Sequence, residues 1–253
     1  MLLRPRARGT PEPGHFDSRR AFGYWRLDDE RAGSGRDGEA RLESFSGWIA
    51  GVGTGSGHRL VVGHWHASPF GQVTDAMVED PAGRRSLYAP TPRLAEFLAG
   101  VYRFDDVQVG TCRARRTGSG WEVRAGPLQL SFAIGRRSPL GWLLRTIPAP
   151  LAGQPWWVSM LDPVARRLLP GVRTRGGTRD GRRQWYGARD LHSIIAARGT
   201  LHGRDLGALG PVRPPVRFGF GSVPDRPSLV HLTTVIEPSP TPGPGSGRSA
   251  GVG

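Results

Sequence analysis

Two acidic residues four positions apart, Asp75 and Glu79, are the first candidates for chemistry. They lie in a mostly uncharged run that begins at Val73, with Met77 between them. In a β-strand, side chains two residues apart share a face, so both carboxyl groups would point the same way. A carboxyl that is partly buried there would have a raised pKa and could act as a general acid or base. The alternative is that Glu79, with Asp80, opens a solvated turn, since charged residues are usually exposed.

The sequence His64-Trp65-His66 is a candidate for metal binding. On a strand, histidines at this spacing share a face, and both imidazoles could reach one metal ion. A cupin-type barrel would add a glutamate a few residues later, but the next glutamate here is Glu79, beyond a Ser-Pro turn. The simpler interpretation is that both histidines lie at the wet end of a strand. We expect no metal, and keep His64 and His66 as an alternative site.

Several other chemistries have no support in the sequence. Ser68, Ser131 and Ser193 have no Gly-x-Ser-x-Gly context, and there is no Gly-Lys-Ser/Thr loop and no Gly-x-Gly-x-x-Gly turn from a strand to a helix. The single cysteine, Cys112, excludes an internal disulfide and a thiolate metal cluster. We therefore expect no cofactor.

A helix start places Arg93 near free backbone amides. Thr91 can cap the helix, and Pro92 suits the first helical position, where a missing N–H costs nothing. Arg93 could bind a carboxylate there with two parallel hydrogen bonds, helped by the amides. The alternative is that the Arg93 side chain is simply exposed to solvent, as most arginines are. The apolar residues that follow at helical spacing are Leu94, Phe97, Leu98 and Val101.

The residues before this helix have a layout that is found elsewhere. Gly83-Arg84-Arg85 leads through Tyr88-Ala89 to Pro90-Thr91-Pro92-Arg93-Leu94-Ala95. This order resembles the acetoacetate decarboxylase-like family, in which Gly-Arg-Glu leads to Pro-Lys-Lys-Leu-Ala. Residues 144–148 and 185–209 are similar to two later segments of that family. The resemblance implies a barrel with a small-molecule pocket, in which Arg93, Tyr88 and Trp185 would contact the substrate.

The chain departs from that family at its catalytic residue. One lysine of the family forms a Schiff base with the substrate, whereas this chain contains no lysine at all. No lysine Schiff base can therefore form here. Arg93 could hold a carboxylate, but a guanidinium stays protonated and cannot attack a carbonyl.

Alternation of apolar and polar residues predicts a chain dominated by strands. The clearest runs are 107–111, 121–125 and 128–134, and the last two are joined by the short Gly126-Pro127 link, so we expect an antiparallel meander. Further strands are predicted at 41–52, 58–66, 73–78 and 229–236, with a similar alternation at 216–220. Short helices are predicted at 92–101 and from an Asp162-Pro163 start, and 140–147 is a short apolar segment that ends at Pro148.

These elements predict a mainly β, or β-rich α+β, fold. We expect an antiparallel or mixed barrel-like sheet with two or three short helices. Residues 1–20 are predicted to be a flexible basic arm, 21–237 a single β-rich domain with an edge strand at 22–25, and 238–253 a disordered tail rich in Pro, Gly and Ser.

The charge balance raises the question of an anionic partner. The formal net charge is +14, from 35 basic residues, all arginine, against 21 acidic ones. The arginines are scattered as pairs along the chain rather than gathered in one stripe, which argues against nucleic acid as the partner. The first residues lack the apolar segment of a secretion signal, and no apolar run approaches membrane-spanning length. We expect a cytoplasmic protein with no membrane partner.

The function that the sequence favours is a small-molecule pocket for a small organic acid, which the protein would bind or transform without a Schiff base. Two alternatives stay open. One is a metal-dependent β-barrel enzyme that uses His64 and His66, and the other is a basic RNA- or DNA-binding protein. These residues are compatible with a catalyst or with a protein that only binds its ligand, and with a homo-oligomer.

Overall fold

A computed structural model describes residues 42–148, 151, 153–168 and 172–238. The predicted basic arm at 1–20, the predicted edge strand at 22–25 and the tail from 239 onward lie outside the described residues. The fold within the described part is mainly β, as the alternating runs predicted.

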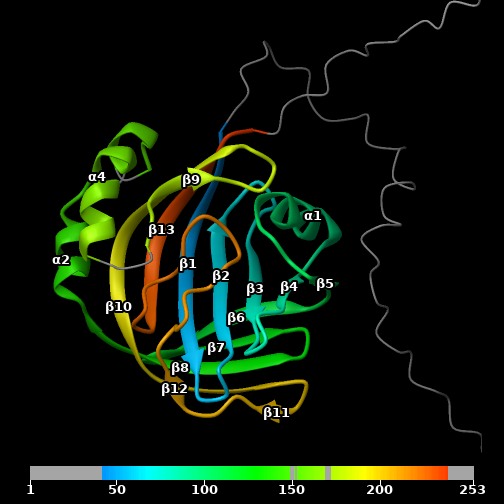
Figure 1. Cartoon of the computed structure of the whole chain (residues 1–253). Helices are drawn as coiled ribbons and strands as arrows, with labels where there is room; N and C mark the ends of the chain where they lie inside the picture. The colour runs from blue at the N-terminus through cyan, green and yellow to red at the C-terminus, as the bar shows by residue number, and fades with distance from the viewer. Residues whose placement is uncertain (1–41, 149–150, 152, 169–171, 239–253) are drawn as a thin grey trace, which may run out of the picture. The chain divides into compact units, whose positions relative to one another are not determined.

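One mixed sheet organises the described residues (Figure 1). Its path runs β5-β4-β3-β2-β1-β13-β10-β8-β7-β6, and three short strands pair at its borders. In chain order the strands are β1 (Glu43–Thr54), β2 (Arg59–Ala67), β3 (Val73–Glu79), β4 (Arg85–Ala89), β5 (Asp106–Val109), β6 (Cys112–Thr117), β7 (Gly120–Ala125), β8 (Leu128–Arg137), β9 (Arg175–Gly177), β10 (Arg183–Leu201), β11 (Arg204–Asp205), β12 (Leu209–Gly210) and β13 (Ser228–Ile236).

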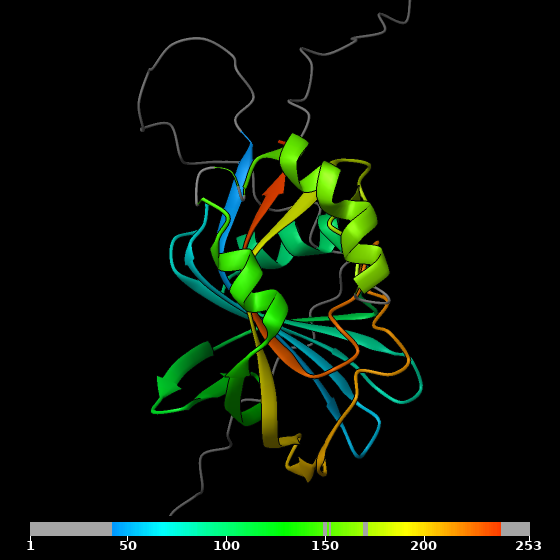
Figure 2. The same ribbon diagram turned by 90° about the vertical axis from the view of Figure 1, so that its left-hand side faces the viewer.

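The sheet curls into a half-barrel because β10 is long and irregular. Its 19 residues pair with β13 in their first half and with β8 in their second. Register shifts between Ala188 and Asp190, and again on either side of Ile194, mark β-bulges, which bend a strand and increase its twist. The β6–β8 hairpins are thereby carried under β1–β3, and β6 packs against β3 (Figures 1 and 2).

Each face of the sheet has its own apolar core, because alternate residues of each strand point to opposite faces. The first core lies inside the curl and includes Val52, Leu60, Val123 and Leu128, all buried. The second lies on the other face. It is formed by the residues one position on, such as Val61 and Met77, with helix α1 (Pro92–Val101) and the segment 211–227 packed over it. The functional site described below belongs to this second face.

The predicted antiparallel pairing is confirmed for β7 and β8, and β6 continues the meander on the other side of β7. The run 107–111 was wrongly placed in it. Val107 and Val109 belong to β5, which ends at Val109 and pairs in parallel with β4. Helix α1 lies between β4 and β5 in the chain and supplies the crossover that a parallel pair requires.

The described residues hold three α-helices, in agreement with the prediction of two or three. Helix α1 begins as predicted, with the Thr91 hydroxyl accepting a hydrogen bond from Leu94 N. Helix α2 (Pro139–Arg145) begins after Ser138, whose hydroxyl accepts from Gly141 N. Both starts combine a hydroxyl cap with proline at the first position.

The predicted start at Asp162-Pro163 was wrong, because α4 spans Pro155–Leu168 and Pro163 lies inside it. Asp162 does not cap this helix. Its buried carboxylate accepts hydrogen bonds from the backbone N (2.8 Å) and Oγ1 (3.0 Å) of Thr174, which lies just before β9. Pro163 cannot donate a backbone hydrogen bond inside the helix. The hydrogen bonds of Asp162 and the packing of the apolar inner face of the helix compensate for this loss.

The alternation at 216–220 does not form a strand. Residues 211–227 cross the second face of the sheet as an irregular segment, with Val216 and Phe218 buried against it. Glu79 accepts from the backbone N of Arg217 at 2.8 Å, which ties this segment to the end of β3. The alternation of apolar and polar residues at 216–220 arises because this segment packs on the sheet, although it is not a strand of it.

Candidate functional site

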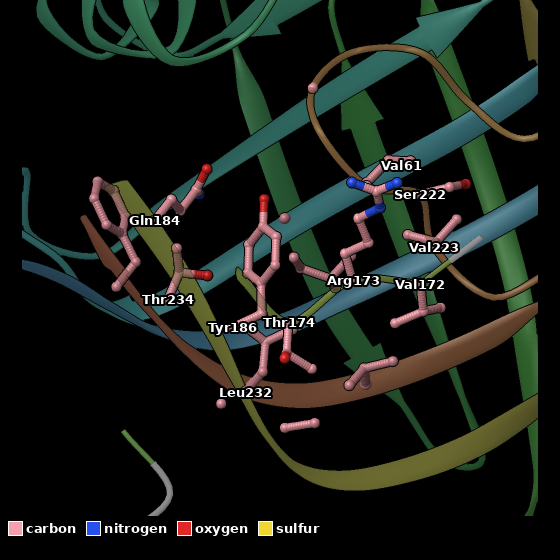
Figure 3. Close-up of a pocket in the computed structure, with 18 of the residues that line it drawn as sticks. Val61, Val172, Arg173, Thr174, Gln184, Tyr186, Ser222, Val223, Leu232 and Thr234 are labelled. Carbon is pink, nitrogen blue, oxygen red and sulfur yellow. The ribbon is translucent and has the colours of Figure 1, made fainter. Parts of the chain in front are cut away.

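A cavity of about 280 Å³ lies over the second face of the sheet. Its floor is formed by residues of β1, β2, β3, β10 and β13, and its sides by α1, α2, α4 and the segment 216–224. Figure 3 shows Gln184, Tyr186 and Thr234 among the lining residues. The lining is mostly apolar. Its polar members are Asp75, Tyr102, Arg173, Thr174, Gln184, Tyr186, Ser222 and Thr234.

The two helices that follow β8 supply one wall through their inner faces. Leu140 and Leu144 of α2, and Trp157, Leu161 and Ala165 of α4, line the cavity. Gly141 permits this arrangement: a Cβ built at this position would lie 2.4 Å from the backbone O of Leu191 in β10. A larger residue would push α2 away from the sheet and open the wall.

A chain of hydrogen bonds joins three polar side chains at one end of the cavity. The hydroxyls of Tyr102 and Tyr186 lie 2.6 Å apart, and Gln184 Nε2 donates to the Tyr102 oxygen at 2.9 Å. Burial raises the pKa of both tyrosines, so both hydroxyls stay neutral near pH 7. The pair can therefore offer hydrogen bonds but no charge.

Two buried oxygen atoms beside this chain have no hydrogen-bond partner among the described residues. They are Gln184 Oε1 and Thr234 Oγ1, and the two residues are 1% and 3% exposed. Tyr186 and Thr234 are direct cross-strand partners on β10 and β13, and Figure 3 shows Gln184 beside them. A buried polar atom without a partner costs about 1–3 kcal/mol. These two atoms are therefore free to meet a polar group inside the cavity.

Asp75 reaches the cavity from β3 and is buried, with an exposed fraction of 2%. Trp65 Nε1 donates to its Oδ1 at 2.8 Å, and no cation pairs with it among the described residues. Burial raises the pKa of this carboxyl to about 7, against the smaller opposing effect of the Trp65 hydrogen bond. Gly63, its cross-strand partner, leaves the room for this contact, since a Cβ there would lie 2.7 Å from both Asp75 Oδ1 and Trp65 Nε1.

Glu79 shares the strand face of Asp75 as predicted, but it lies in a different environment. It is fully buried, and its Oε1 lies 3.3 Å from Arg59 Nη2 and 3.0 Å from Arg217 Nε. It does not line the cavity. The solvated turn that was the alternative for Glu79 is therefore wrong, and the residue's contacts join β3 to β2 and to the segment 211–227.

The three predicted substrate contacts do not line the cavity either. Arg93 is exposed on the outer side of α1. Tyr88 is buried in the first core, on the opposite face of the sheet. Trp185 packs with Val158 and Val235, and its Nε1 donates to Ser159 Oγ at 3.2 Å. Arg173, which sequence reasoning did not single out, is exposed and lines the cavity, and so stands at its rim.

His64 and His66 share a face of β2, as their spacing predicted. His64 Nδ1 lies 2.9 Å from Thr74 Oγ1, and the His66 ring stacks 5.9 Å from that of His231. Burial lowers the pKa of His64, so its imidazole is neutral near pH 7. Among the described residues, no group of three or more His, Cys, Asp or Glu side chains is placed to hold a metal ion.

The Cys112 thiol is not suited to act as a nucleophile. Burial raises the pKa of the Cys112 thiol to about 12, so it stays protonated and is a poor nucleophile.

No helix in the described part of the chain is both long and apolar enough to cross a membrane.

Sequence reasoning found Asp75 but missed Tyr102, Gln184, Tyr186 and Thr234. Gln184 and Tyr186 are two residues apart, which would have indicated a shared face had a strand been predicted there, but none was predicted over 184–201. Nothing local indicated that α1 would deliver Tyr102 to the same place, because that contact joins residues 82 positions apart.

Comparison with known proteins adds little to this description. No family model matches the chain, and no curated protein matches its sequence. One solved structure that matches this chain is a protein from Nitrosomonas europaea described as a putative AttH, with 13% sequence identity and a TM-score of 0.29. The match covers 81% of this chain and 53% of that protein, so the chain spans about half its length. The resemblance to the acetoacetate decarboxylase-like family stays a prediction.

Proposed function

We propose that this protein binds a small, mostly apolar organic molecule that carries a polar group at one end. The observation that carries the proposal is the mostly apolar cavity in which two buried oxygen atoms, Gln184 Oε1 and Thr234 Oγ1, lack partners. Ligand sites are typically concave and apolar, with a few polar groups that fix orientation. The cavity volume of about 280 Å³ lies at the small end of such sites.

The polar end of the ligand would meet Gln184, Thr234 and the tyrosine pair. An amide or hydroxyl hydrogen of the ligand satisfies Gln184 Oε1, which can only accept. A ligand carboxylate would instead lie at the rim, where Arg173 is the cationic side chain among the described lining residues. The proposal therefore keeps the predicted organic acid as a ligand class but assigns its carboxylate to Arg173 rather than to Arg93.

The experiment compares decanoic acid, decanol and decanamide by thermal shift and calorimetry. Thr234→Val replaces the hydroxyl by a methyl of similar shape, so it should leave the free protein as stable as before or more so. The same variant should weaken binding of the best probe roughly 3–10-fold, the worth of one hydrogen bond.

Thr74→Val is the matched control. Thr74 is also buried on a central strand, but its hydroxyl is bonded to His64 on the other face of the sheet. This variant should lose stability and keep its affinity for the probe. Absence of any stabilisation by the three probes would refute the proposal, and so would unchanged affinity in Thr234→Val.

A second candidate function, acid–base catalysis, has one specific observation in its favour. Asp75 touches the cavity and its pKa of about 7 makes it half protonated near neutral pH. Such a carboxyl can give or take a proton without a metal or a Schiff base. Probe binding should then depend on pH with a midpoint near 7, and Asp75→Asn should abolish that dependence. A flat profile in the unsubstituted protein would argue against a proton-transfer role.

A further inference from the structure

The outer faces of α2 and α4 expose large apolar side chains that nothing in the described structure covers. Seven such residues are exposed in the described part of the chain, and four of them lie on these two helices. Their exposed fractions are 61% for Trp142, 61% for Leu143, 57% for Trp156 and 65% for Met160. Figures 1 and 2 show both helices on the outer side of β10.

The spacing on α4 separates two faces of the same helix. Trp157, Leu161 and Ala165 point to the cavity, as described above. Trp156 and Met160 are one turn apart and lie on the opposite, exposed face. The helix is thus apolar on both sides, and only the inner side is explained by packing on the sheet.

The charges around this surface leave a positive excess, although three arginines pair with buried carboxylates: Arg137 and Arg145 with Asp190, and Arg166 with Asp162. Residues 136–168 contain five arginines and one acidic residue, Asp162. Asp162 is buried and bonded to Thr174 and Arg166, so it adds no negative charge to the surface. Arg136 and Arg167 are exposed, and neither has a side-chain partner among the described residues. The surface therefore complements a partner that is both apolar and anionic.

We propose that the outer face of α2 and α4 docks on the surface of an anionic lipid bilayer. Amphipathic helices of this kind lie in the membrane interface, with Trp, Leu and Met in the acyl boundary and arginines at the headgroups. A nucleic acid would meet the arginines but would leave Met160 and Leu143 in water. The sequence argued against a membrane partner because no run reaches spanning length, but docking on the surface needs no such run.

The docking face is continuous with the cavity. Leu143 both lines the cavity and is 61% exposed, so it stands at the rim between the two. A bilayer docked on this face would lie against the cavity wall formed by α2 and α4. The docking inference does not require that the cavity binds a ligand, and its test is separate.

The experiment is co-sedimentation of the full chain with vesicles of phosphatidylcholine alone or mixed with phosphatidylglycerol. We expect binding to the mixed vesicles, a blue shift of tryptophan fluorescence, and weaker binding as salt rises from roughly 0.05 to 0.5 M. Trp142→Gln/Trp156→Gln should weaken binding at least tenfold. Arg136→Gln/Arg167→Gln should weaken it several-fold and flatten its salt dependence.

Two matched controls keep the test specific. Val109→Gln removes an apolar side chain that is 39% exposed on β5, an edge strand that five other strands separate from β10 along the sheet path, and should leave vesicle binding unchanged. Arg116→Gln/Arg204→Gln removes two exposed arginines of β6 and β11, and should also leave it nearly unchanged. No binding to mixed vesicles would overturn the inference. Self-association of the free protein that disappears in Trp142→Gln/Trp156→Gln would overturn it in favour of a second copy of the chain.

Discussion

At the scale of single residues, Asp75 is a buried carboxyl group whose charged form is destabilised by burial. Its pKa of about 7 in the folded protein, against 3.8 for an ordinary Asp, means that the folded state binds this proton more tightly than the unfolded state. Stability from this group is therefore full below about pH 4 and is lost as pH rises through 7. Asp75→Asn keeps an oxygen for Trp65 and removes the charge. It should raise the free energy of unfolding by about 2–4 kcal/mol at pH 8.5 and by little at pH 4.

Urea denaturation at a series of pH values measures this difference. Asp105→Asn is a suitable control, because Asp105 is an exposed partner of Arg85 and its pKa is lowered, chiefly by the Arg85 hydrogen bond. That change should alter stability by no more than about 1 kcal/mol. A variant Asp75→Asn that is destabilised at pH 8.5 would mean that the carboxylate has a partner we have not identified.

Glu79, on the same strand face, should behave in the opposite way. Its carboxylate is fully buried against Arg59, which is 4% exposed, and Arg217, which is 68% exposed. Glu79→Gln leaves the Arg59 charge buried and unpaired, so we expect a loss of about 3–5 kcal/mol in urea denaturation. Arg217→Gln should cost about 1 kcal/mol or less, since that side chain is mostly solvated. Equal losses in the two variants would contradict this division.

At the scale of elements, local signals were sufficient where the element depends on its own sequence. Thr91-Pro92 carries a cap and a proline, and a helix begins there as predicted. Ser138-Pro139 carries the same signal and starts α2, although it was not recognised as a helix start. The runs of β7 and β8 were predictable in the same way, apart from their limits, whereas the strand character of β6 was not. The parallel pairing of β5 was not predictable either, because it depends on how α1 returns the chain to β4. Asp162-Pro163 failed because Asp162 bonds to Thr174, twelve residues on.

Helix α4 offers a test at this scale. Pro163 lies in its interior, is exposed, and cannot donate the backbone hydrogen bond that the helix would otherwise have there. Pro163→Ala should raise the free energy of unfolding by about 1–3 kcal/mol, measured by thermal or urea denaturation. Pro155→Ala is the control, since proline suits the first turn and its loss should bring no gain. Destabilisation by Pro163→Ala would mean that a bend at this position is needed for the cavity wall.

At the scale of the whole molecule, the site is assembled from parts that the sequence keeps far apart. Asp75 comes from β3, Tyr102 from the end of α1, Gln184 and Tyr186 from β10, and Thr234 from β13. Sequence reasoning could place Asp75 and Thr234 on strands, but the bulges of β10 decide which strands face one another. Tyr88 and Trp185 were selected from the resemblance to a family, and neither of them lines the cavity.

Ligand binding in the cavity and membrane docking should be separable by mutation, because α2 and α4 line the cavity with their inner faces and would dock with their outer faces. Ala188 lines the cavity floor on β10, so Ala188→Phe should fill the space with little cost to stability, unlike overpacking of a dense core. In the unsubstituted protein, a probe at 100 times its Kd raises the free energy of unfolding by about 2.7 kcal/mol. The Ala188→Phe variant should show no such increase. Its binding to phosphatidylglycerol vesicles should be unchanged.

Trp142→Gln/Trp156→Gln should show the reverse pattern, because neither tryptophan lines the cavity. Probe stabilisation should be kept and vesicle binding lost, with thermal shift and co-sedimentation measured on the same preparations. Loss of both properties in either variant, while the circular dichroism spectrum stays native, would show that α2 and α4 act as one surface. The cavity and the docking face would then have to be explained together, with Leu143 at the rim as the residue that joins them.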